Sequence, residues 1–457
     1  MKFLFITKPL IMEPLGIMYL SSVLKSKGHE TGLEIISEGL EERVATFNPD
    51  FIGYSIMTGD EKLYDEVNLK LKSKLKFFSI AGGPHPTFFP EFFEESSFDA
   101  ICRGEGEEAI QLFLENPTYS KNPNLWIKNK EKEIIKNPLQ PLIKDLDEIP
   151  FPDRAIVANC YQIQETPIRH FIASRGCPFD CTYCFNKSFS ELYEGKGKRV
   201  RFRSVSNLIE EIEQTMLLNP STKLNYFQDD TFTLDDNWLK EFSEAYQKRI
   251  GRPFHCHVRA NTLTEEKVEY LRKAGCYSVH FAIETGNDDL RNEILNRGMG
   301  KEHIFKAVTL LKKAGIKYIT QNMIGIPGGN LEADFETLEL NIACKPDYAW
   351  VSIFQPYPGT ALGRLCQEKG YYKGDFQDLN NNFFDSSKLE FPEEYKSQLS
   401  HLQKLFAIFV EHPDLYQLGL VHPMINAPQE EEIKMAYQKA YRDFRKIGDK
   451  RIYGFDL

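Results

Sequence analysis

The sequence of 457 residues lacks any long hydrophobic run. No window approaches the roughly 20 uninterrupted apolar residues that a membrane-spanning helix needs. The first ten residues, MKFLFITKPL, include a short apolar stretch but no small-residue cleavage site, so they do not match a secretory signal peptide. These absences exclude the membrane-spanning class and predict a cytoplasmic protein with no transmembrane segment.

A surplus of positive charge is also missing. The chain has 56 Lys and Arg residues against 66 Asp and Glu residues, which gives a formal net charge of -10. Such a charge repels a phosphate backbone, and neither a basic stripe nor a nucleic-acid-binding motif offsets it. We therefore expect no nucleic-acid partner.

Short-period repeats and low-complexity tracts are absent as well. With 42% hydrophobic and 27% charged residues, the composition is that of a globular protein and excludes a disordered or collagen-like chain. A chain of this length is longer than one hydrophobic core ordinarily accommodates, so two or three domains are expected.

Cysteines are few, and only three of the nine lie close together in the sequence. In a long chain without a signal peptide, this pattern favours a metal site over a disulfide framework. The other six cysteines are interpreted as small buried hydrophobic residues.

What the sequence does contain, from Lys2 to about Asn116, is an alternation of short apolar runs and helical patterns. The runs FLFIT, FIGYSIM, FFSIAGG and FDAICRG are separated by segments such as PLGIMYLSSVLKSKG. This rhythm predicts an α/β fold with a doubly wound, Rossmann-like parallel sheet. Such sheets bind ligands beyond the carboxyl ends of their strands. The segments expected at these ends are rich in Gly, Pro and small polar residues, which allow close approach of a ligand to the backbone; they are residues 7–14, 55–59, 82–87 and 104–106. Ordinary turns between strand and helix are the alternative for each segment.

The rest of the chain changes character twice. Residues 117–154 include a hairpin-like WIKNKEKEIIKN and a connector punctuated by proline. Six strand–helix units then follow from about Arg169, which predicts a partial (β/α)6 barrel with its chemistry at the carboxyl ends of the strands. We predict a domain at 1–137, a linker at 138–168, the partial barrel at 169–365 and a small, mostly helical C-terminal region at 366–457.

The three neighbouring cysteines, Cys177, Cys181 and Cys184, form a C-x3-C-x2-C run in GCPFDCTYCFN, directly after a predicted strand. A cubane iron–sulfur cluster has four irons that each take one ligand, so three thiolates leave one iron open for a substrate or cofactor. A structural zinc site is one alternative and needs a fourth ligand. The candidates for that ligand are His170, His255, Cys256 and His257. A chance cluster of cysteines without metal is the other alternative.

The segment CPFDCTYC resembles the signature of the radical S-adenosylmethionine (radical SAM) enzymes, and a doubly wound domain ahead of it resembles the subgroup that binds cobalamin (vitamin B12). The resemblance covers about residues 1–365. Eight further segments resemble landmarks of that subgroup in their usual order: PLGIMYLSSVLKSKGHE, GGPHPTFFPE, FDAICRGEGEEAI, DLDEIPFPDR, FQDDTF, IETGNDDL, MIGIPGG and PYPGTAL.

This resemblance implies three cofactors: a 4Fe-4S cluster, S-adenosyl-L-methionine (SAM) and cobalamin. The implied reaction is reductive cleavage of SAM to a 5'-deoxyadenosyl radical and methylation of an unactivated carbon, or phosphorus, of a small-molecule biosynthetic intermediate. The implied partner is an external one-electron donor of the flavodoxin or ferredoxin type. Two alternatives stay open: a cyclase or rearrangement enzyme with the same cofactors but no methyl transfer, and a cobalamin-binding sensor or carrier with an inert metal site.

The resemblance also assigns residues to the cluster and to SAM. Cys177, Cys181 and Cys184 take the role of cluster ligands, and the amino and carboxylate groups of SAM chelate the open iron. The residues implied to contact SAM are Tyr183, Asp229, Asp230, Arg259, Glu284, Gly325 and Pro327. The segment QDD stands where the family often has Gly-Gly-Glu, so Asp229 or Asp230 is expected to orient the SAM ammonium group. A cap at the start of the next helix is the alternative for these two aspartates.

In the N-terminal domain, the resemblance implies that the nucleotide tail of cobalamin threads between strands. The implied contacts are Leu10, Ile11, Met12, Ser55, Thr58, Gly82, Gly83, Pro84, His85 and Glu105. The D-x-H-x-x-G motif that supplies an axial histidine in many cobalamin proteins is absent, so His85 is not expected to ligate cobalt. The loop from Pro9 to Glu13 is expected under the lower cobalt face instead. On the substrate side we expect Tyr357, for which ordinary core packing is the alternative.

Overall fold

The computed structural model describes residues 1–115, 122–374, 379 and 383–456 of the chain. The chain divides into two compact units. The first comprises Met1–His170, Ser188–Arg203 and Gln214–Pro220, and the second comprises Phe171–Lys187, Ser204–Glu213 and Ser221–Leu457. The finer division proposed above, with boundaries after residues 137, 168 and 365, stays a prediction.

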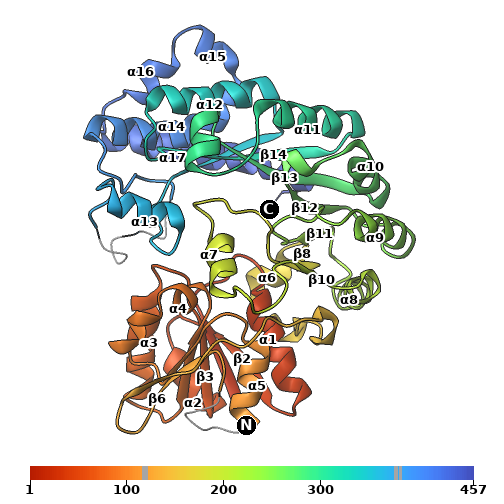
Figure 1. Cartoon of the computed structure of the whole chain (residues 1–457), viewed down its shortest axis with the longest axis vertical. Helices are drawn as coiled ribbons and strands as arrows, with labels where there is room; N and C mark the ends of the chain where they lie inside the picture. Colours follow the sequence, from red (N-terminus) through yellow and green to blue (C-terminus); the bar gives the residue numbers. More distant parts are fainter. Residues whose placement is uncertain (116–121, 375–378, 380–382, 457) are drawn as a thin grey trace. The chain divides into compact units, whose positions relative to one another are not determined.

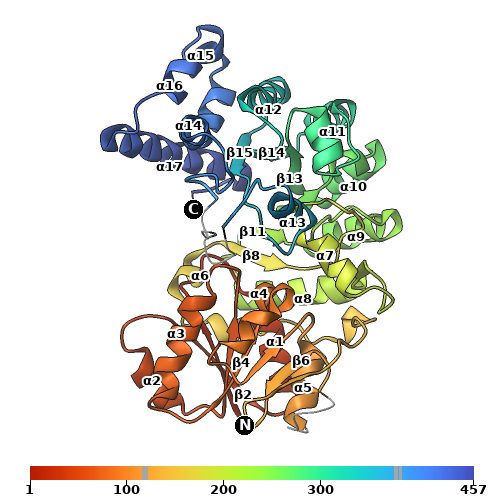
Figure 2. The same cartoon turned by 60° about the vertical axis from the view of Figure 1, so that its left-hand side comes forward.

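The first unit contains a seven-stranded sheet in the order β2-β1-β3-β4-β5-β6-β7. Its strands are β1 (Lys2–Thr7), β2 (Glu30–Ile35), β3 (Phe51–Ser55), β4 (Phe78–Gly82), β5 (Ala100–Cys102), β6 (Leu125–Lys128) and β7 (Ile134–Lys136). The first five strands are parallel. The flanking helices are α1 (Leu15–Ser26), α2 (Leu40–Phe47), α3 (Glu61–Lys72) and α5 (Glu107–Glu115). Figures 1 and 2 show α1 and α5 on one face of the sheet and α2 and α3 on the other, which confirms the doubly wound prediction.

The two edges of this sheet are formed by strand β2 and by the hairpin of β6 and β7. Strand β2 could not be predicted from the sequence, because its residues ETGLEI mix polar and apolar side chains and none is fully buried at the sheet edge. At the other edge β6 and β7 pair antiparallel, with Trp126 opposite Lys136. This pairing confirms the predicted hairpin.

A six-stranded sheet has the order β15-β14-β13-β12-β11-β8, and its strands β11 to β15 lie in the second unit. The strands are β8 (Ile168–Phe171), β11 (Leu224–Phe227), β12 (Phe254–Val258), β13 (Cys276–Glu284), β14 (Lys317–Ile324) and β15 (Tyr348–Ile353). The strands from β11 to β15 are parallel to their neighbours. Helices follow the strands on the outer side: α8 (Val205–Leu218), α9 (Asp236–Arg249), α10 (Glu265–Ala274), α11 (Lys301–Ala314) and α12 (Leu331–Cys344). Strands in sequential order with outer helices confirm the partial barrel.

The register of this sheet gathers polar side chains on one face. Tyr226 of β11 pairs with His255 of β12, and His257 of β12 pairs with His280 of β13. Paired residues of neighbouring strands project to the same face, and residues two apart on one strand do so as well. All four rings therefore share one face of the sheet.

The C-terminal region consists mainly of two long helices, α14 (Glu393–Glu411) and α17 (Glu431–Tyr453), as the sequence predicts. Leu402 and Phe406 of α14 belong to the same buried apolar cluster as Val351 and Ile353 of β15. Near the end of α17, the Ile452 carbonyl accepts a hydrogen bond of 2.7 Å from Ser278 Oγ of β13. Among the described residues, no helix combines the length and the apolar composition that crossing a membrane requires.

Candidate active site

A cavity of about 210 Å³ in the second unit is lined by all three neighbouring cysteines. Cys177, Cys181 and Cys184 lie in the loop between β9 (Ser174–Arg175) and α7 (Phe185–Leu192). The loop closes in a turn in which the Cys184 amide donates a hydrogen bond of 3.2 Å to the Cys181 carbonyl. The fold thus brings the three thiols to one hollow at the carboxyl end of the sheet.

The three sulfur atoms are spread too widely to share one ion. Among the described residues, a single group of His, Cys, Asp or Glu side chains has at least three donor atoms within 4.8 Å of one another, and it consists of histidines. A cubane cluster instead takes each thiolate on a different iron. The spacing therefore fits a cluster better than the zinc alternative. His170, one candidate for a fourth zinc ligand, places Nδ1 3.3 Å from Glu13 Oε2.

The remaining six cysteines differ in burial, and none of the nine forms a disulfide. Four of the six are buried, in agreement with their interpretation as small hydrophobic residues. Cys160 is only half-buried, so that interpretation is wrong for this residue, whereas Cys102 is half-buried as a residue but its thiol is buried.

Two arginines adjoin the sulfur of Cys181. Arg259, which follows β12, places Nη1 3.5 Å from this Sγ, and its guanidinium lies 3.8 Å from the ring centre of Phe179. Arg297 places its own Nη1 3.9 Å from the same sulfur. Arg259 was expected at the site, but Arg297 was not, because it lies in the loop segment NRGMG outside the segments that resemble family landmarks.

Glu284 ends β13 with an unusual backbone. Its φ is 67°, in the left-handed region, and the strand register shifts between Ala282 and Glu284. Its carboxylate accepts a hydrogen bond of 2.7 Å from the Tyr183 hydroxyl, which in turn accepts one of 2.9 Å from Arg297 Nη1. Burial raises the pKa of Glu284, and the Arg297 guanidinium opposes that rise. A strained conformation held by such a network is typical of a functional position.

The two aspartates that follow β11 occupy different surroundings. Asp229 is buried and accepts hydrogen bonds from the Ala173 amide, at 3.1 Å, and from Ser174 Oγ, at 2.5 Å. Burial raises its pKa to about 6. Asp230 lines the cavity and accepts a hydrogen bond of 2.8 Å from Asn186 Nδ2. The capping alternative is wrong for both, because Asp235 caps helix α9 through the Trp238 amide.

Three other residues expected near SAM or substrate, Gly325, Pro327 and Tyr357, are not among the described residues that line this cavity. Gly325 follows β14 with φ at 67°, and its amide donates a hydrogen bond of 3.0 Å to Asp334 Oδ1. Pro327 lies two residues further along the same turn. The ring centre of Tyr357 lies 6.0 Å from that of Phe185.

Two histidines also line the cavity, one named above only as an alternative zinc ligand and one not expected there. They are His257 of β12 and His280 of β13. Burial lowers the pKa of His257 to about 4. The sequence contains a usable signal, since His255 and His257 alternate along one predicted strand, but the partner strand of His280 follows only from the fold.

In the first unit, the residues expected to contact cobalamin follow the parallel strands. His85 belongs to the short helix α4 (Pro84–Phe88) after β4, and its Nδ1 lies 3.4 Å from Thr58 Oγ1. Its side chain is buried, yet Nε2 finds no hydrogen-bond partner among the described residues. Gly83 has φ at 99°, and a Cβ there would lie 3.0 Å from the Ile56 amide nitrogen and carbonyl oxygen. The neighbouring Gly82 has far more room, with nothing closer than 3.8 Å to such a Cβ.

The loop after β1 exposes apolar side chains. Ile11 is 88% exposed and Met12 is 46% exposed, while Leu10 is half-buried. Met57, which the sequence analysis misses, is 54% exposed shortly after β3, and Ser55 at the end of β3 is also exposed. Apolar side chains left uncovered at a ligand-binding edge are typical of a surface that a ligand covers.

Glu105, which was expected to contact cobalamin, forms its contacts with other residues of the first unit. Its carboxylate forms a buried ion pair with Arg201, at 2.9 Å, and accepts a hydrogen bond of 2.9 Å from the Ile143 amide. Its own amide donates to the Tyr193 hydroxyl at 3.2 Å. These contacts give Glu105 a structural role within the first unit.

Comparison with known proteins agrees with this arrangement. The profile of the radical SAM superfamily matches residues 171–340, and the profile of the B12 binding domain matches residues 1–114. An uncharacterized methyltransferase of Pyrococcus horikoshii is 30% identical over 364 residues, which cover 76% of this chain and 77% of that protein. Cytidylyl-2-hydroxyethylphosphonate methyltransferase of Streptomyces wedmorensis is 24% identical over 435 residues, which cover 79% of each. The anaerobic magnesium-protoporphyrin IX monomethyl ester cyclase of Rubrivivax gelatinosus is 26% identical over 385 residues, which cover 78% of this chain and 66% of that protein.

Solved structures share the fold over almost the whole chain. The cobalamin-dependent S-adenosylmethionine radical enzyme OxsB, with aqua-cobalamin bound, has a TM-score of 0.72 at 17% identity and covers 99% of this chain and 72% of its own. The radical SAM methyltransferase TsrM from Kitasatospora setae, solved with tryptophan substrate and a SAM analog, has a TM-score of 0.67 at 13% identity and covers 97% of this chain and 98% of its own.

Proposed function

This chain belongs to the cobalamin-binding family of radical SAM enzymes, and we propose that it methylates an unactivated carbon, or a phosphorus, of a small molecule. The observation that carries the proposal is the single cavity that three cysteines share with Asp230, Arg259 and Glu284. A relative of 30% identity is named as a methyltransferase, which supports the same reaction class.

The cysteine loop fits a 4Fe-4S cluster. Cys177, Cys181 and Cys184 offer three thiols at spacings that suit separate irons, and the cavity beside them leaves room for a fourth ligand that is not protein. When bound, the cluster supplies the electron that cleaves SAM to a radical. Arg259 and Arg297 hold positive charge near Cys181, which stabilises a thiolate ligand there.

The polar side chains of the cavity match the groups of SAM. Asp230 and Glu284 offer carboxylates for the ammonium group and the ribose hydroxyls, and Arg259 offers a guanidinium for the carboxylate. Tyr183 and Arg297 hold Glu284 in position. We assign Asp229 a supporting role, because its two oxygens already accept hydrogen bonds from the backbone and side chain that precede the cysteine loop. Gly325 and Pro327 shape the turn after β14, where they are proposed to adjoin the adenine, and Tyr357 is proposed to face the substrate.

The first unit fits cobalamin. The unpartnered, buried Nε2 of His85 offers a polar contact to the nucleotide tail, beside Thr58. Gly82 leaves space beside it, and Ile11 and Met12 offer exposed apolar contacts to the corrin ring. When bound, cobalamin supplies the methyl group that is transferred.

Two further assignments complete the proposal. A one-electron donor of the flavodoxin or ferredoxin type is the proposed partner, because a cluster that cleaves SAM must be reduced before each turnover. The proposed compartment is the cytoplasm, since nine free thiols without a disulfide are what a reducing compartment maintains.

The principal rival is a ring-forming or rearranging enzyme with the same cofactors, a reaction class that the relative from Rubrivivax gelatinosus carries in its name. Anaerobic incubation with SAM labelled at its methyl group, a reductant and a metabolite extract from cells lacking this protein distinguishes the two. We expect label in a new small-molecule product together with 5'-deoxyadenosine. Deoxyadenosine with an unlabelled product would favour the rival, and a protein that contains zinc but no iron would refute both in favour of a sensor or carrier.

A further inference from the structure

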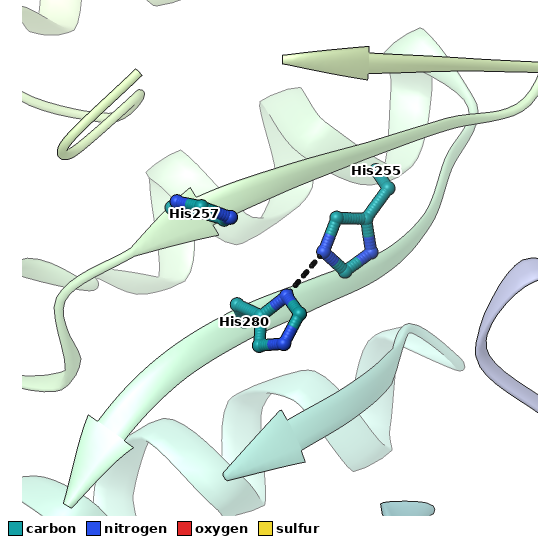
Figure 3. Close-up of side chains that lie close together, drawn as sticks. All are labelled: His255, His257 and His280. Atoms are coloured by element: carbon teal, nitrogen blue, oxygen red, sulfur yellow. Dashed lines mark hydrogen bonds between the residues drawn. The ribbon is translucent and has the colours of Figure 1, made fainter. Parts of the chain in front are cut away.

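Three histidines of the second unit form a compact cluster on the inner face of the sheet. His255 and His257 are two residues apart on β12, and His280 lies on β13 in register with His257 (Figure 3). One ring nitrogen of each histidine lies within 4.8 Å of the others. Cys256, between the first two histidines, projects to the opposite face of the strand and is not part of the group.

The contacts define which nitrogen of each ring faces the centre. His255 Nε2 lies 2.7 Å from His280 Nδ1, and the Tyr226 hydroxyl lies 2.9 Å from His257 Nε2. The same hydroxyl is 3.4 Å from His280 Nδ1. The inward atoms are therefore Nε2 of His255, Nε2 of His257 and Nδ1 of His280.

A chain of hydrogen bonds sets the tautomer of His255. Ser278 Oγ donates its only hydrogen to the Ile452 carbonyl, at 2.7 Å. The contact of 2.7 Å between Ser278 Oγ and His255 Nδ1 must then have Nδ1 as its donor. The proton of a neutral His255 is thus on Nδ1, and the lone pair of Nε2 points at the centre of the cluster. Oxygen acceptors that orient an imidazole in this way are a regular feature of metal-binding histidines.

We propose that His255, His257 and His280 bind one divalent transition-metal ion of the kind that imidazole favours, such as Zn²⁺ or Co²⁺. Three histidines are the protein ligands of one class of catalytic zinc sites, in which the fourth position is open. Here His257 and His280 also line the cavity of the three cysteines, so the fourth position faces that cavity. An ion in this position acts as a Lewis acid toward an oxygen or nitrogen atom of a small molecule bound there.

The surrounding charges admit a cation. The guanidinium of Arg445 acts electrostatically on His280, but its Nε forms an ion pair of 2.9 Å with Asp449. The two nitrogens of His255 and His280 lie 2.7 Å apart, whereas two nitrogens bound to one tetrahedral ion lie about 3.3 Å apart, so the rings must separate by about 0.6 Å, which rotation about the side-chain bonds provides. The inference does not rest on the proposed methyl transfer.

Metal binding by the three histidines can be measured in a chain that lacks the three neighbouring cysteines. The full chain with Cys177, Cys181 and Cys184 all replaced by Ser is titrated anaerobically with CoCl₂, and the visible absorption of Co²⁺ is followed. We expect a single ion per chain, with bands of a four- or five-coordinate site and no sulfur-to-cobalt charge transfer. Adding His257→Gln or His280→Gln should abolish these bands, whereas His303→Gln, at a half-buried histidine of α11 outside the cluster, should leave them unchanged.

Ser278→Ala provides a second variant that keeps all three ligands. It removes the acceptor that orients His255, so affinity for Co²⁺ should fall about tenfold or more. Thermal unfolding with and without ZnCl₂ shows whether each variant is folded, since the parent should be stabilised by the ion and the His variants should not.

A third measurement uses the chain with intact cysteines and a reconstituted cluster. Metal analysis should then find zinc in addition to iron, and His257→Gln should remove the zinc and leave the iron. The inference is overturned if the triple-serine chain, which lacks Cys177, Cys181 and Cys184, binds Co²⁺ no more tightly than its folded His257→Gln variant, or binds it only at millimolar concentration. Sulfur-to-cobalt charge transfer in the triple-serine chain, which would come from one of its six remaining cysteines, would also overturn it.

Discussion

The guanidinium of Arg259 lies against the sulfur of Cys181, with Nη1 3.5 Å from Sγ and both side chains buried. The face of the same guanidinium covers the ring of Phe179. Arg259 is therefore placed to act on a cluster ligand as well as on SAM. Hydrogen bonds and positive charge near the sulfurs are among the factors that set the potential of an iron–sulfur cluster.

Replacing this arginine should lower the reduction potential of the cluster. In Arg259→Gln the positive charge near Cys181 is lost, so the reduced, more negative cluster becomes less favourable, by on the order of tens of millivolts. An anaerobic redox titration without SAM, followed by electron paramagnetic resonance, measures the change. Arg272→Gln, at an exposed arginine paired with Glu269 on α10, is the matched control. An unchanged or higher potential in Arg259→Gln would contradict the prediction.

Cys181→Ala should remove the iron–sulfur cluster and leave cobalamin bound. Because this cysteine lies in the second unit and the proposed cobalamin contacts lie in the first, the variant should lose its iron and the formation of 5'-deoxyadenosine but retain cobalamin. Iron analysis, chromatography of the nucleoside and the absorption spectrum of bound cobalamin provide the three readouts. Cys366→Ala, at a buried cysteine outside the cavity, should keep about four irons. Retention of a full iron complement in Cys181→Ala would refute the ligand assignment.

Gly83→Ala should weaken cobalamin binding. Gly83 has φ at 99° and ψ at -170°, a region that is essentially restricted to glycine, so an alanine there costs on the order of 1–3 kcal/mol by itself. At Gly83 the new Cβ would in addition lie 3.0 Å from backbone atoms of Ile56, beside the proposed site. Gly28→Ala is a matched control, because its φ is also positive, at 81°, and nothing lies within 4 Å of the new Cβ. Calorimetric titration with hydroxocobalamin should show weaker binding for Gly83→Ala only, and equal affinities would argue against this position.

Glu13 should stabilise the first unit in a pH-dependent way. Burial tends to raise its pKa, but Arg154, with Nη1 2.9 Å from Oε1, and His170 outweigh burial, and the pKa is lowered from 4.5 to about 2. A carboxylate whose pKa falls on folding stabilises the fold above its unfolded pKa, and this contribution is lost as the pH falls through the folded pKa. We expect Glu13→Gln to cost about 3 kcal/mol at pH 7 and progressively less between about pH 4.5 and 2. Urea unfolding at about pH 7 and pH 3 measures the difference.

The control for this measurement is Glu38→Gln, at an exposed glutamate of the same unit. It should change the urea midpoint little at either pH. A cost for Glu13→Gln that is the same at both pH values would show that packing, and not the charge of Glu13, stabilises this site.

Much of the fold could be predicted because it depends on short-range periodicity. The helices at Val205–Leu218, Asp236–Arg249 and Glu393–Glu411 and all six strands of the partial barrel follow from patterns within single windows of sequence. Strand β2 escapes this reasoning, since an edge strand buries too little of either face to show a clear pattern. Met57 escapes as well, because the exposure of an apolar side chain after a strand depends on what the fold leaves uncovered.

By itself, the sequence determines the three-cysteine loop, because ligands three and four residues apart are brought together by one local turn whatever surrounds it. Only the tertiary structure decides what faces that loop. Arg297 reaches Cys181 from 116 residues away, and His280 meets His257 through the register of two neighbouring strands. Such contacts depend on strand order, on register and on the packing of many distant residues, and no local spacing encodes them.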